Sequence, residues 1–210
     1  MNLLSINVSK LTNLKTIEKN IPTGIYKQPV EGPVFIRATG IEGDTVVDTH
    51  VHGGLDQAVY IYTLEDYLWW EKELNRELTP GIFGENLTIS NLGDAPLNIG
   101  DHLHIGKVVL EITAPRVPCF KLAARMEDPK FGKKFVNAVR PGVYARVLQE
   151  GNVSVGDNVI LIKTTNDYAT TNDVFIEWHK KERLPELLQK ALNSPMAAVH
   201  KSRFAEWLKS

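Results

Sequence analysis

Short apolar stretches separated by turn residues dominate the first 165 residues of the chain. The stretches hold four to six residues each, and β-branched or aromatic side chains are frequent in them. Turns such as Gly53-Gly54, Gly100-Asp101 and Gly151-Asn152 lie between them. The predicted strands are Leu3–Val8, Val34–Arg37, Ala58–Tyr62, Asn86–Ile89, His102–Ile105, Val108–Thr113, Val143–Leu148 and Val159–Lys163. Many short strands at this spacing indicate an antiparallel sandwich or barrel rather than alternating strand–helix units.

A short internal similarity supports this interpretation. Ile99-Gly100-Asp101 precedes one predicted strand, and Val155-Gly156-Asp157 precedes another. Two strands that begin with the same Gly-Asp turn indicate equivalent positions in one barrel, although the similarity is too short to define a repeat.

One helix is predicted within the strand-rich part. Thr63 is followed three residues later by Asp66, an arrangement similar to the capping box that begins many helices. Helical spacing places Leu64, Tyr67, Leu68, Glu71 and Leu74 in one largely apolar stripe, with Trp70 beside it.

The chain changes to helical patterning after residue 165. Three short helices are predicted at Asp173–Arg183, Pro185–Leu192 and Ser202–Leu208. Helices of this length are unstable alone in water, so Trp178 and Trp207 require burial against other elements. We therefore predict a mainly β, barrel-like domain over residues 1–165 with a few helices, and a small three-helix appendage over residues 166–210. The appendage can pack on the barrel or on a second subunit, which leaves a homodimer open.

Composition places the chain among soluble globular proteins. Its 210 residues are 43% hydrophobic and 23% charged, with a formal net charge of −1. The single cysteine, Cys119, cannot form an internal disulfide or a multi-thiolate metal site. No apolar run approaches the roughly 20 residues of a membrane span, and no secretory leader is recognisable. We expect a cytoplasmic protein that binds neither a nucleic-acid polymer nor a membrane.

The near-zero net charge conceals a basic segment. Between Pro115 and Arg146, eight basic residues face only two acidic ones. Cations near a thiol lower its pKa, and they also suit a phosphorylated ligand. The lysines between residues 130 and 134 fit the solvated face of a helix in which Phe131 and Phe135 point inward.

Cys119 lies in the densest part of this segment. A predicted strand runs into Pro115 and Pro118, which end strand pairing and stiffen the turn. A helix predicted directly after Cys119 would place the thiol at a helix N-terminus, with Arg116 and Lys121 close by. The alternative is a small buried apolar residue, the usual role of an intracellular cysteine.

A histidine and two glycines form a second candidate segment. Gly53-Gly54 allows the backbone to approach a ligand, and His52 before it can donate a hydrogen bond, bind a metal or act as acid or base. Asp44 and Asp48 are close enough in sequence to orient a histidine.

His102 and His104 share the alternate spacing of His50 and His52. Their alternation with Leu103 and Ile105 predicts outward-facing residues of a half-buried strand. The alternative is a zinc site formed by all four histidines, but their spacing matches no common zinc-binding motif.

The loop Pro80–Leu87 is the third candidate segment. Gly81 and Gly84 would leave backbone N–H groups exposed, and the Asn86 amide suits reading the edge of a heterocycle. An equally good interpretation is a loop that packs against the helix after Thr63. The phosphate-binding and dinucleotide-binding glycine motifs are missing, which disfavours nucleoside triphosphate and Rossmann chemistry.

Together these segments resemble the MOSC family, named for the C-terminal domain of molybdenum-cofactor sulfurase. The similar pieces follow the order of that family through residue 165, and the helical tail resembles the three-helix extension of its bacterial YiiM-like branch. The pieces are Tyr26-Lys27-Gln28-Pro29-Val30, Gly43-Asp44, His52-Gly53-Gly54, Ala58-Val59-Tyr60, Phe83-Gly84-Glu85-Asn86-Leu87, Ile99-Gly100-Asp101 and Pro115-Arg116-Val117-Pro118-Cys119-Phe120-Lys121-Leu122.

The resemblance implies a molybdenum–pterin cofactor and the reduction of N-hydroxylated compounds such as 6-hydroxylaminopurine. Cys119 would ligate molybdenum, and His52 or Lys121 would assist protonation. The implied cofactor-binding residues are Lys27, Gly53, Gly54, Gly84, Asn86, Arg116, Lys121 and Arg125. No flavin or nicotinamide motif is present, so a separate electron-donor reductase protein is implied as a partner.

Two alternatives stay open at this point. In a sulfur carrier without reductase turnover, the same cysteine would hold a persulfide. In a cysteine hydrolase or transferase, Cys119 would act with His52.

Overall fold

We analysed a computed structural model, which describes residues 1–15, 20–45, 47, 54–92 and 96–209. His52 and Gly53, both expected in the site, lie outside the described residues.

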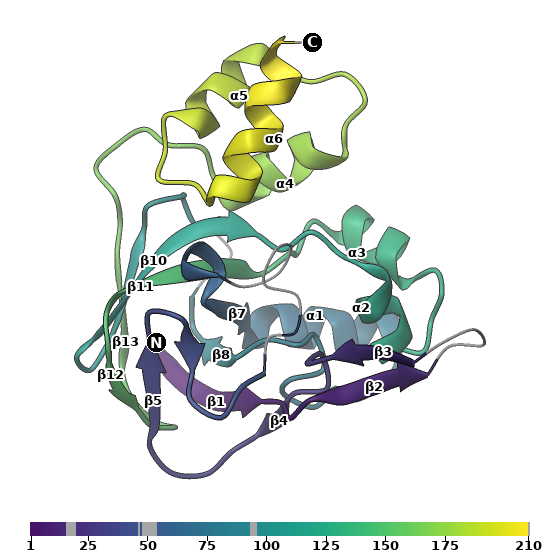
Figure 1. The fold of residues 1–210 in the computed structure, drawn as a ribbon, viewed down its shortest axis with the longest axis vertical. Coiled ribbons are helices and arrows are strands. Elements are labelled where there is room, and N and C mark those ends of the chain that lie inside the picture. Colours follow the sequence, from purple (N-terminus) through teal and green to yellow (C-terminus); the bar gives the residue numbers. More distant parts are fainter. Residues whose placement is uncertain (16–19, 46, 48–53, 93–95, 210) are drawn as a thin grey trace.

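The fold is built around a mixed sheet of eight strands in the order β13-β9-β10-β11-β7-β8-β1-β4 (Figure 1). Its strands are β1 (Asn2–Val8), β4 (Gln28–Pro29), β7 (Val59–Thr63), β8 (Leu87–Ser90), β9 (His102–Ile105), β10 (Val108–Pro115), β11 (Val143–Gln149) and β13 (Val159–Ile162). Neighbours in the sheet are antiparallel, except that β7 and β8 run parallel. The helix that joins β7 to β8 makes the parallel pairing feasible, since parallel strands need a long connection.

Two smaller sheets complete the β structure. One is formed by β5 (Val34–Arg37), β6 (Gly40–Ile41) and β12 (Gly151–Val153), and the other by β2 (Thr12–Lys15) and β3 (Asn20–Thr23). Each of the eight predicted strands overlaps an observed one. The mainly β class is confirmed.

The two ends of the large sheet approach each other. Backbone hydrogen bonds run from Leu3 N to Asp157 O over 2.9 Å, from Gly156 N to Leu3 O over 2.8 Å, and from Val159 N to Met1 O over 2.9 Å. The strand pairings of the described residues do not form a closed barrel, so the barrel-like description stays a prediction.

The two Gly-Asp turns singled out in the sequence have the same geometry. Gly100 and Gly156 have φ values of 88° and 94°, which favour glycine. In each turn the aspartate carboxylate accepts from the backbone N–H three residues earlier, at 2.8 Å for Asp101 and 2.7 Å for Asp157. The strands that follow, β9 and β13, are hydrogen-bonded neighbours.

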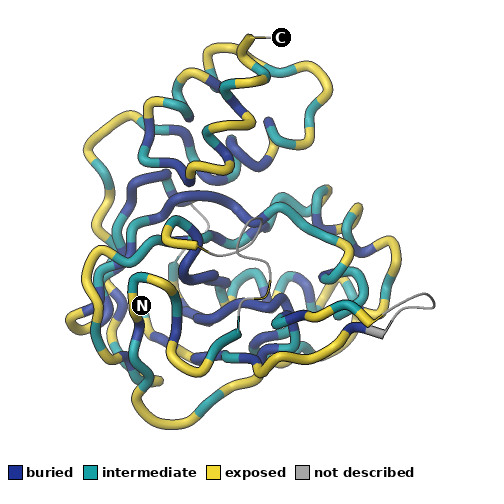
Figure 2. Tube along the Cα trace, viewed as in Figure 1, coloured by how far each residue is buried: buried dark blue, intermediate teal, exposed yellow. Residues whose placement is uncertain are grey.

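Alternation along β9 places its apolar side chains in the core, whereas β8 is buried on both faces. In β9, Leu103 and Ile105 are fully buried, whereas His102 and His104 between them are half-buried. The His102 imidazole lies 3.5 Å from the Glu111 carboxylate on β10, as expected for an outward-facing pair. Figure 2 shows the buried segments gathered in the interior of the sheet, alternating with intermediate and exposed ones.

Helix α1 (Leu64–Leu74) begins at the predicted cap, where the Thr63 side chain accepts from Asp66 N at 3.1 Å. Its predicted stripe was wrong in part, because Leu64 and Leu68 are exposed. The helix instead buries Tyr67 and Trp70 in an aromatic cluster with Phe83, Phe131 and Phe135. Burying larger aromatic surface determines which side of α1 faces inward.

Helices α2 (Phe120–Arg125) and α3 (Phe131–Ala138) follow β10. Phe131 and Phe135 are fully buried and the lysines at 130, 133 and 134 are exposed, which confirms the predicted solvated face.

Helices α4 (Thr171–His179), α5 (Pro185–Leu192) and α6 (Ala198–Lys209) lie together beyond β10 and β11 (Figure 1). They enclose their own apolar cluster, which includes Val174, Leu188 and Phe204. The three predicted helices are therefore confirmed. The division of the chain into domains at residue 165 stays a prediction.

Candidate functional site

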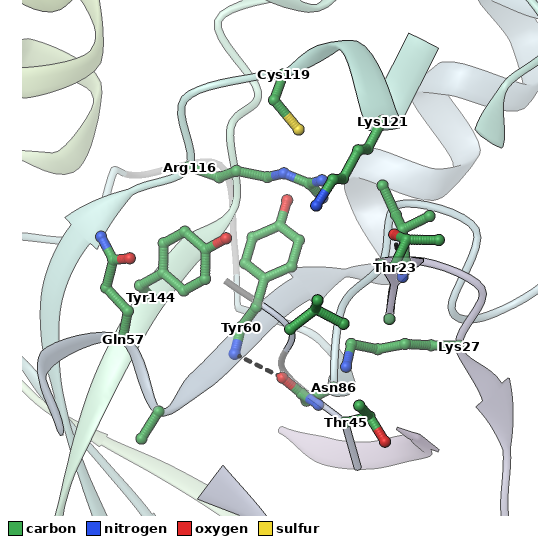
Figure 3. A pocket seen from close by; sticks show the side chains of 15 residues that line it. Thr23, Lys27, Thr45, Gln57, Tyr60, Asn86, Arg116, Cys119, Lys121 and Tyr144 are labelled. Carbon is green, nitrogen blue, oxygen red and sulfur yellow. Dashed lines mark hydrogen bonds between the residues drawn. The ribbon is translucent and has the colours of Figure 1, made fainter. Parts of the chain in front are cut away.

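A cavity of about 100 Å³ brings several distant segments together (Figure 3). Cys119, Arg116 and Lys121 reach it from the turn after β10 and from α2, while Lys27 and Asn86 lie at its opposite end. The described lining residues are Thr23, Gly24, Ile25, Lys27, Thr45, Val47, Gln57, Ala58, Tyr60, Gly84, Asn86, Arg116, Cys119, Lys121 and Tyr144. Six residues proposed from the sequence, namely Lys27, Gly84, Asn86, Arg116, Cys119 and Lys121, are thus brought to one cavity.

Cys119 occupies the position that the sequence predicted. The strand β10 ends at Pro115, and Cys119 is the extended residue that caps α2, with φ −125° and ψ 169°. Its carbonyl accepts from Leu122 N at 3.0 Å, which starts the helix. The half-buried thiol lines the cavity, so it is not an inert residue of the apolar core.

Arg116 forms a buried cationic wall of the cavity. One of its terminal nitrogens, Nη1, donates to the Phe83 carbonyl, and its guanidinium lies 4.9 Å from the centre of the Tyr60 ring. Arg116 Nε is buried and has no hydrogen-bond partner among the described residues.

Gly84 packs closely against Ile25 beside this guanidinium. Its φ of 75° favours glycine, and an added Cβ would lie 3.1 Å from Ile25 Cγ1 and 3.6 Å from Arg116 Nη1.

Lys27 and Asn86 share one carboxylate, that of Asp44. Lys27 Nζ and Asn86 Nδ2 both donate to Asp44 Oδ2, the latter at 2.9 Å. Burial lowers the pKa of Lys27, and the neighbouring Asp44 opposes that shift. Asn86 Oδ1 also accepts from Tyr60 N at 3.1 Å. Both ends of the Asn86 amide are therefore engaged within the protein, which suits positioning the wall better than reading a heterocycle.

Tyr60 and Tyr144 are lining residues that the sequence did not single out as site residues. They come from adjacent strands, β7 and β11, and their ring centres are 5.0 Å apart. Burial raises the pKa of both phenols, so they remain protonated donors at neutral pH. The Tyr60 hydroxyl donates to the Pro141 carbonyl at 2.9 Å.

The loop before β8 uses its backbone groups internally. Gly81 N donates to Glu85 Oε1 at 2.6 Å and Gly84 N donates to Gly81 O at 2.9 Å, so the expected exposed N–H groups were wrong. Tyr67 of α1 also donates to Glu85 Oε1, which ties the loop to that helix.

Two further proposed residues lie outside the described lining of the cavity. Arg125 stacks over Tyr26 with its guanidinium carbon 5.1 Å from the ring centre. Gly54 precedes the short helix η1 (Leu55–Gln57).

Comparison with known proteins shows the family. The family model described as MOSC domain matches residues 48–160. The chain belongs to the MOSC domain family. The uncharacterised protein YflK of Bacillus subtilis is 39% identical over 159 residues, which are 76% of this chain and 72% of YflK.

A solved structure shares the whole arrangement, including the C-terminal helices. The crystal structure of YiiM from Geobacillus stearothermophilus has a TM-score of 0.81 at 28% identity, over 99% of this chain and 98% of that one. The YiiM-like branch inferred from the sequence is therefore confirmed.

A third MOSC relative is a much longer protein. A protein of Gibberella moniliformis named "Reductase" is 40% identical over 147 residues, which are 68% of this chain and 26% of that protein.

Within the described part of the present chain, no helix is long and apolar enough to cross a membrane.

Proposed function

We propose that this chain is a molybdenum-cofactor-dependent reductase of N-hydroxylated compounds, such as 6-hydroxylaminopurine. The observation that carries the proposal is the cavity in which one thiol, Cys119, lies with the cations Arg116, Lys121 and Lys27. The MOSC family and the relative named "Reductase" support it.

The lining residues fit a molybdenum–pterin group with a phosphate. A thiolate is a soft ligand of the kind such a metal prefers, and the cofactor's own sulfurs complete the set, so one cysteine suffices. The buried, unpartnered Arg116 Nε is a donor available to an anionic ligand.

When bound, the cofactor would supply the two electrons that convert an N–OH group and two protons into N–H and water. The residues of the chain would bind and orient the reactants. Cys119 would hold the metal, and Arg116 would hold the phosphate. Lys121 and the protonated phenol of Tyr144 line the cavity as proton donors, while the Tyr60 hydroxyl is already bonded to the Pro141 carbonyl.

The electrons must come from outside this chain. We propose a separate electron-donor reductase protein as the partner, since the sequence contains no flavin or nicotinamide motif.

The first prediction concerns Cys119→Ser. Protein produced in a host that makes the cofactor is expected to contain molybdenum and pterin near one per chain, with reduction of 6-hydroxylaminopurine when a chemical reductant is supplied. Cys119→Ser should lose at least tenfold in both metal content and turnover. Elemental analysis, pterin fluorescence and anaerobic turnover would measure this.

Lys130→Ala is the matched control, because this exposed lysine lies in the same basic segment but does not line the cavity. Full metal content and turnover in Cys119→Ser would overturn the ligand role. A persulfide on Cys119, seen as one added sulfur by mass spectrometry, without any reductase turnover would favour the sulfur carrier instead.

A further inference from the structure

Asp44 lies where four separate segments meet, beside the cavity. Its Oδ1 accepts from Ser9 N at 2.8 Å and from Ser9 Oγ at 3.3 Å, so the end of β1 fixes the carboxylate. Its Oδ2 accepts from Lys27 Nζ and from Asn86 Nδ2. The single Ser9 hydroxyl proton is shared with the closer Gly24 carbonyl at 2.7 Å, so the firm donors are Ser9 N on Oδ1 and Lys27 and Asn86 on Oδ2. These donors leave the carboxylate one orientation.

The Lys27–Asp44 ion pair is buried. The exposed fractions of the two side chains are 8% and 4%. A buried pair of this kind adds little to stability over an apolar pair, but the loss of one partner leaves an uncompensated charge. The charged and titratable groups that act on Lys27 are Asp44, Glu85 and Arg116.

Of these three groups, Asp44 matters most for the positive charge of Lys27. Arg116 is a second buried cation and opposes the positive charge of Lys27, while Asp44 makes the direct contact that favours it. Glu85 also favours that charge but is held by Tyr67, Gly81 and Thr88.

We propose that Asp44 is a positioning residue of the cavity, which holds Lys27 as an ammonium ion at the cavity wall and fixes the Asn86 amide beside it. Asn86 in turn holds the Tyr60 backbone, and the Tyr60 ring supports the Arg116 guanidinium. One carboxylate therefore aligns both cationic walls of the cavity, although it is not among the residues that line it.

The consequence for turnover rests on the proposed function, whereas the consequence for Lys27 does not. Without Asp44, Lys27 is expected to become neutral at a lower pH, because the desolvated cation loses its contact partner. A ligand anion in the cavity would then meet one fewer positive charge at neutral pH.

The second prediction tests Asp44→Asn, which keeps an acceptor oxygen for Ser9 and removes the charge. Lysine labelled with ¹³C at Cε would be followed by NMR across pH, and the Lys27 signal would be assigned by its absence in Lys27→Met. We expect the Lys27 midpoint to fall by at least one pH unit, a tenfold rise in its neutral fraction. On the alkaline side of the pH profile, the reductase activity of the variant should fall at a correspondingly lower pH than that of the parent.

Glu42→Gln is the matched control, since Glu42 lies two residues away in an exposed pair with Arg37 at 3.0 Å. It should leave the Lys27 midpoint unchanged. A Lys27 midpoint in Asp44→Asn within about 0.3 pH unit of the parent, a twofold change in the dissociation constant, would overturn the proposal, because a merely structural role of Asp44 would not move it.

A double variant decides the case in which Asp44→Asn does not fold. Adding Lys27→Met removes the uncompensated cation, so the double variant should unfold at a higher urea concentration than Asp44→Asn. Equal or lower resistance would overturn the proposal. If Lys27 shifts as expected but the parent protein has no reductase activity, the proposed function fails and the role of Asp44 stands.

Discussion

Glu85 connects the loop before β8 to helix α1 through one carboxylate oxygen. Its Oε1 accepts from Tyr67, from Gly81 N at 2.6 Å and from Thr88 Oγ1 at 2.9 Å. Its Oε2 is buried with no hydrogen-bond partner among the described residues. Burial raises the pKa of this carboxyl, against the effect of the three donors.

The third prediction follows from this raised pKa. Burial makes ionised Glu85 less favourable in the folded state than in the unfolded chain, so this contribution to stability is full below the unfolded value of 4.5 and is lost as pH rises through the folded pKa. Glu85→Gln keeps the accepting oxygen and cannot ionise. Between pH 5 and pH 8, the free energy of unfolding of the variant should rise relative to that of the parent. The rise should be on the order of 1 kcal/mol for each unit of pKa shift.

Urea unfolding at both pH values would measure this gain, and Glu42→Gln, at an exposed position, should follow the parent. If the difference in free energy of unfolding between Glu85→Gln and the parent were the same at both pH values, the raised pKa of Glu85 would be contradicted.

Sequence reasoning found the site residues whose chemistry is unusual for their position. Cys119 is the single cysteine, and Arg116 and Lys121 flank it within one motif. It missed Tyr144, because a tyrosine in a strand is a common residue with no distinguishing signal. It predicted that Asp44 would orient a histidine. The contact of Asp44 with Lys27 could not be predicted, because it depends on how two loops meet.

At the scale of elements, strands with clear alternation were predicted well and short polar strands were not. The strand β9 was predicted with its observed bounds, because His102 and His104 alternate with Leu103 and Ile105. The hairpin β2–β3 was missed, since its strands are four residues long and partly polar. The inward side of α1 was misjudged, because it depends on aromatic partners from α3.

The helices α4–α6 contain a buried histidine that acts as a weak point in acid. His200 is 4% exposed, its ring centre lies 4.9 Å from that of Trp178, and neither ring nitrogen has a hydrogen-bond partner among the described residues. Burial lowers the pKa of His200 to about 4.

The fourth prediction is therefore a loss of stability in mild acid. The neutral imidazole is favoured in the folded state, so this contribution is present above the unfolded value of 6.5 and is lost as pH falls toward 4. The loss is up to about 3 kcal/mol. His200→Leu should match or exceed the parent at pH 7 and lose less stability between pH 6.5 and pH 4.

Urea unfolding across this range, followed by tryptophan fluorescence, would measure the difference. His104→Gln, at a half-buried strand position, is the control and should keep the pH dependence of the parent. An unchanged acid slope in His200→Leu would contradict the prediction.

At the scale of the whole molecule, Arg146 links the large sheet to the C-terminal helices. Its guanidinium lies 3.0 Å from Glu111 Oε2 and 2.8 Å from Asp56 Oδ1, and Nη2 donates to Pro195 O at 3.1 Å. Asp56 Oδ2 also accepts from Ala198 N at 2.8 Å, at the start of α6. The helices are therefore held to the sheet by polar contacts as well as by apolar packing.

The fifth prediction concerns Arg146→Met, which keeps the apolar stem and removes the guanidinium. Loss of charged hydrogen bonds should cost about 1–3 kcal/mol in the free energy of unfolding. Limited proteolysis of the segment 163–170 should become several times faster. Arg203→Met, in an exposed pair with Glu206 on α6, should resemble the parent. Equal cleavage rates in both variants would show that Arg146 does not hold the helices in place.

The contact between the first residues and the segment 156–159 has a consequence for synthesis. The start of β1 cannot obtain its final backbone partners until residue 159 has left the ribosome, so the sheet is completed late. The described cavity residues extend from Thr23 to Tyr144, so the cavity is also assembled from segments far apart in the chain. Any prosthetic group that the cavity holds must therefore enter after Tyr144 has been translated.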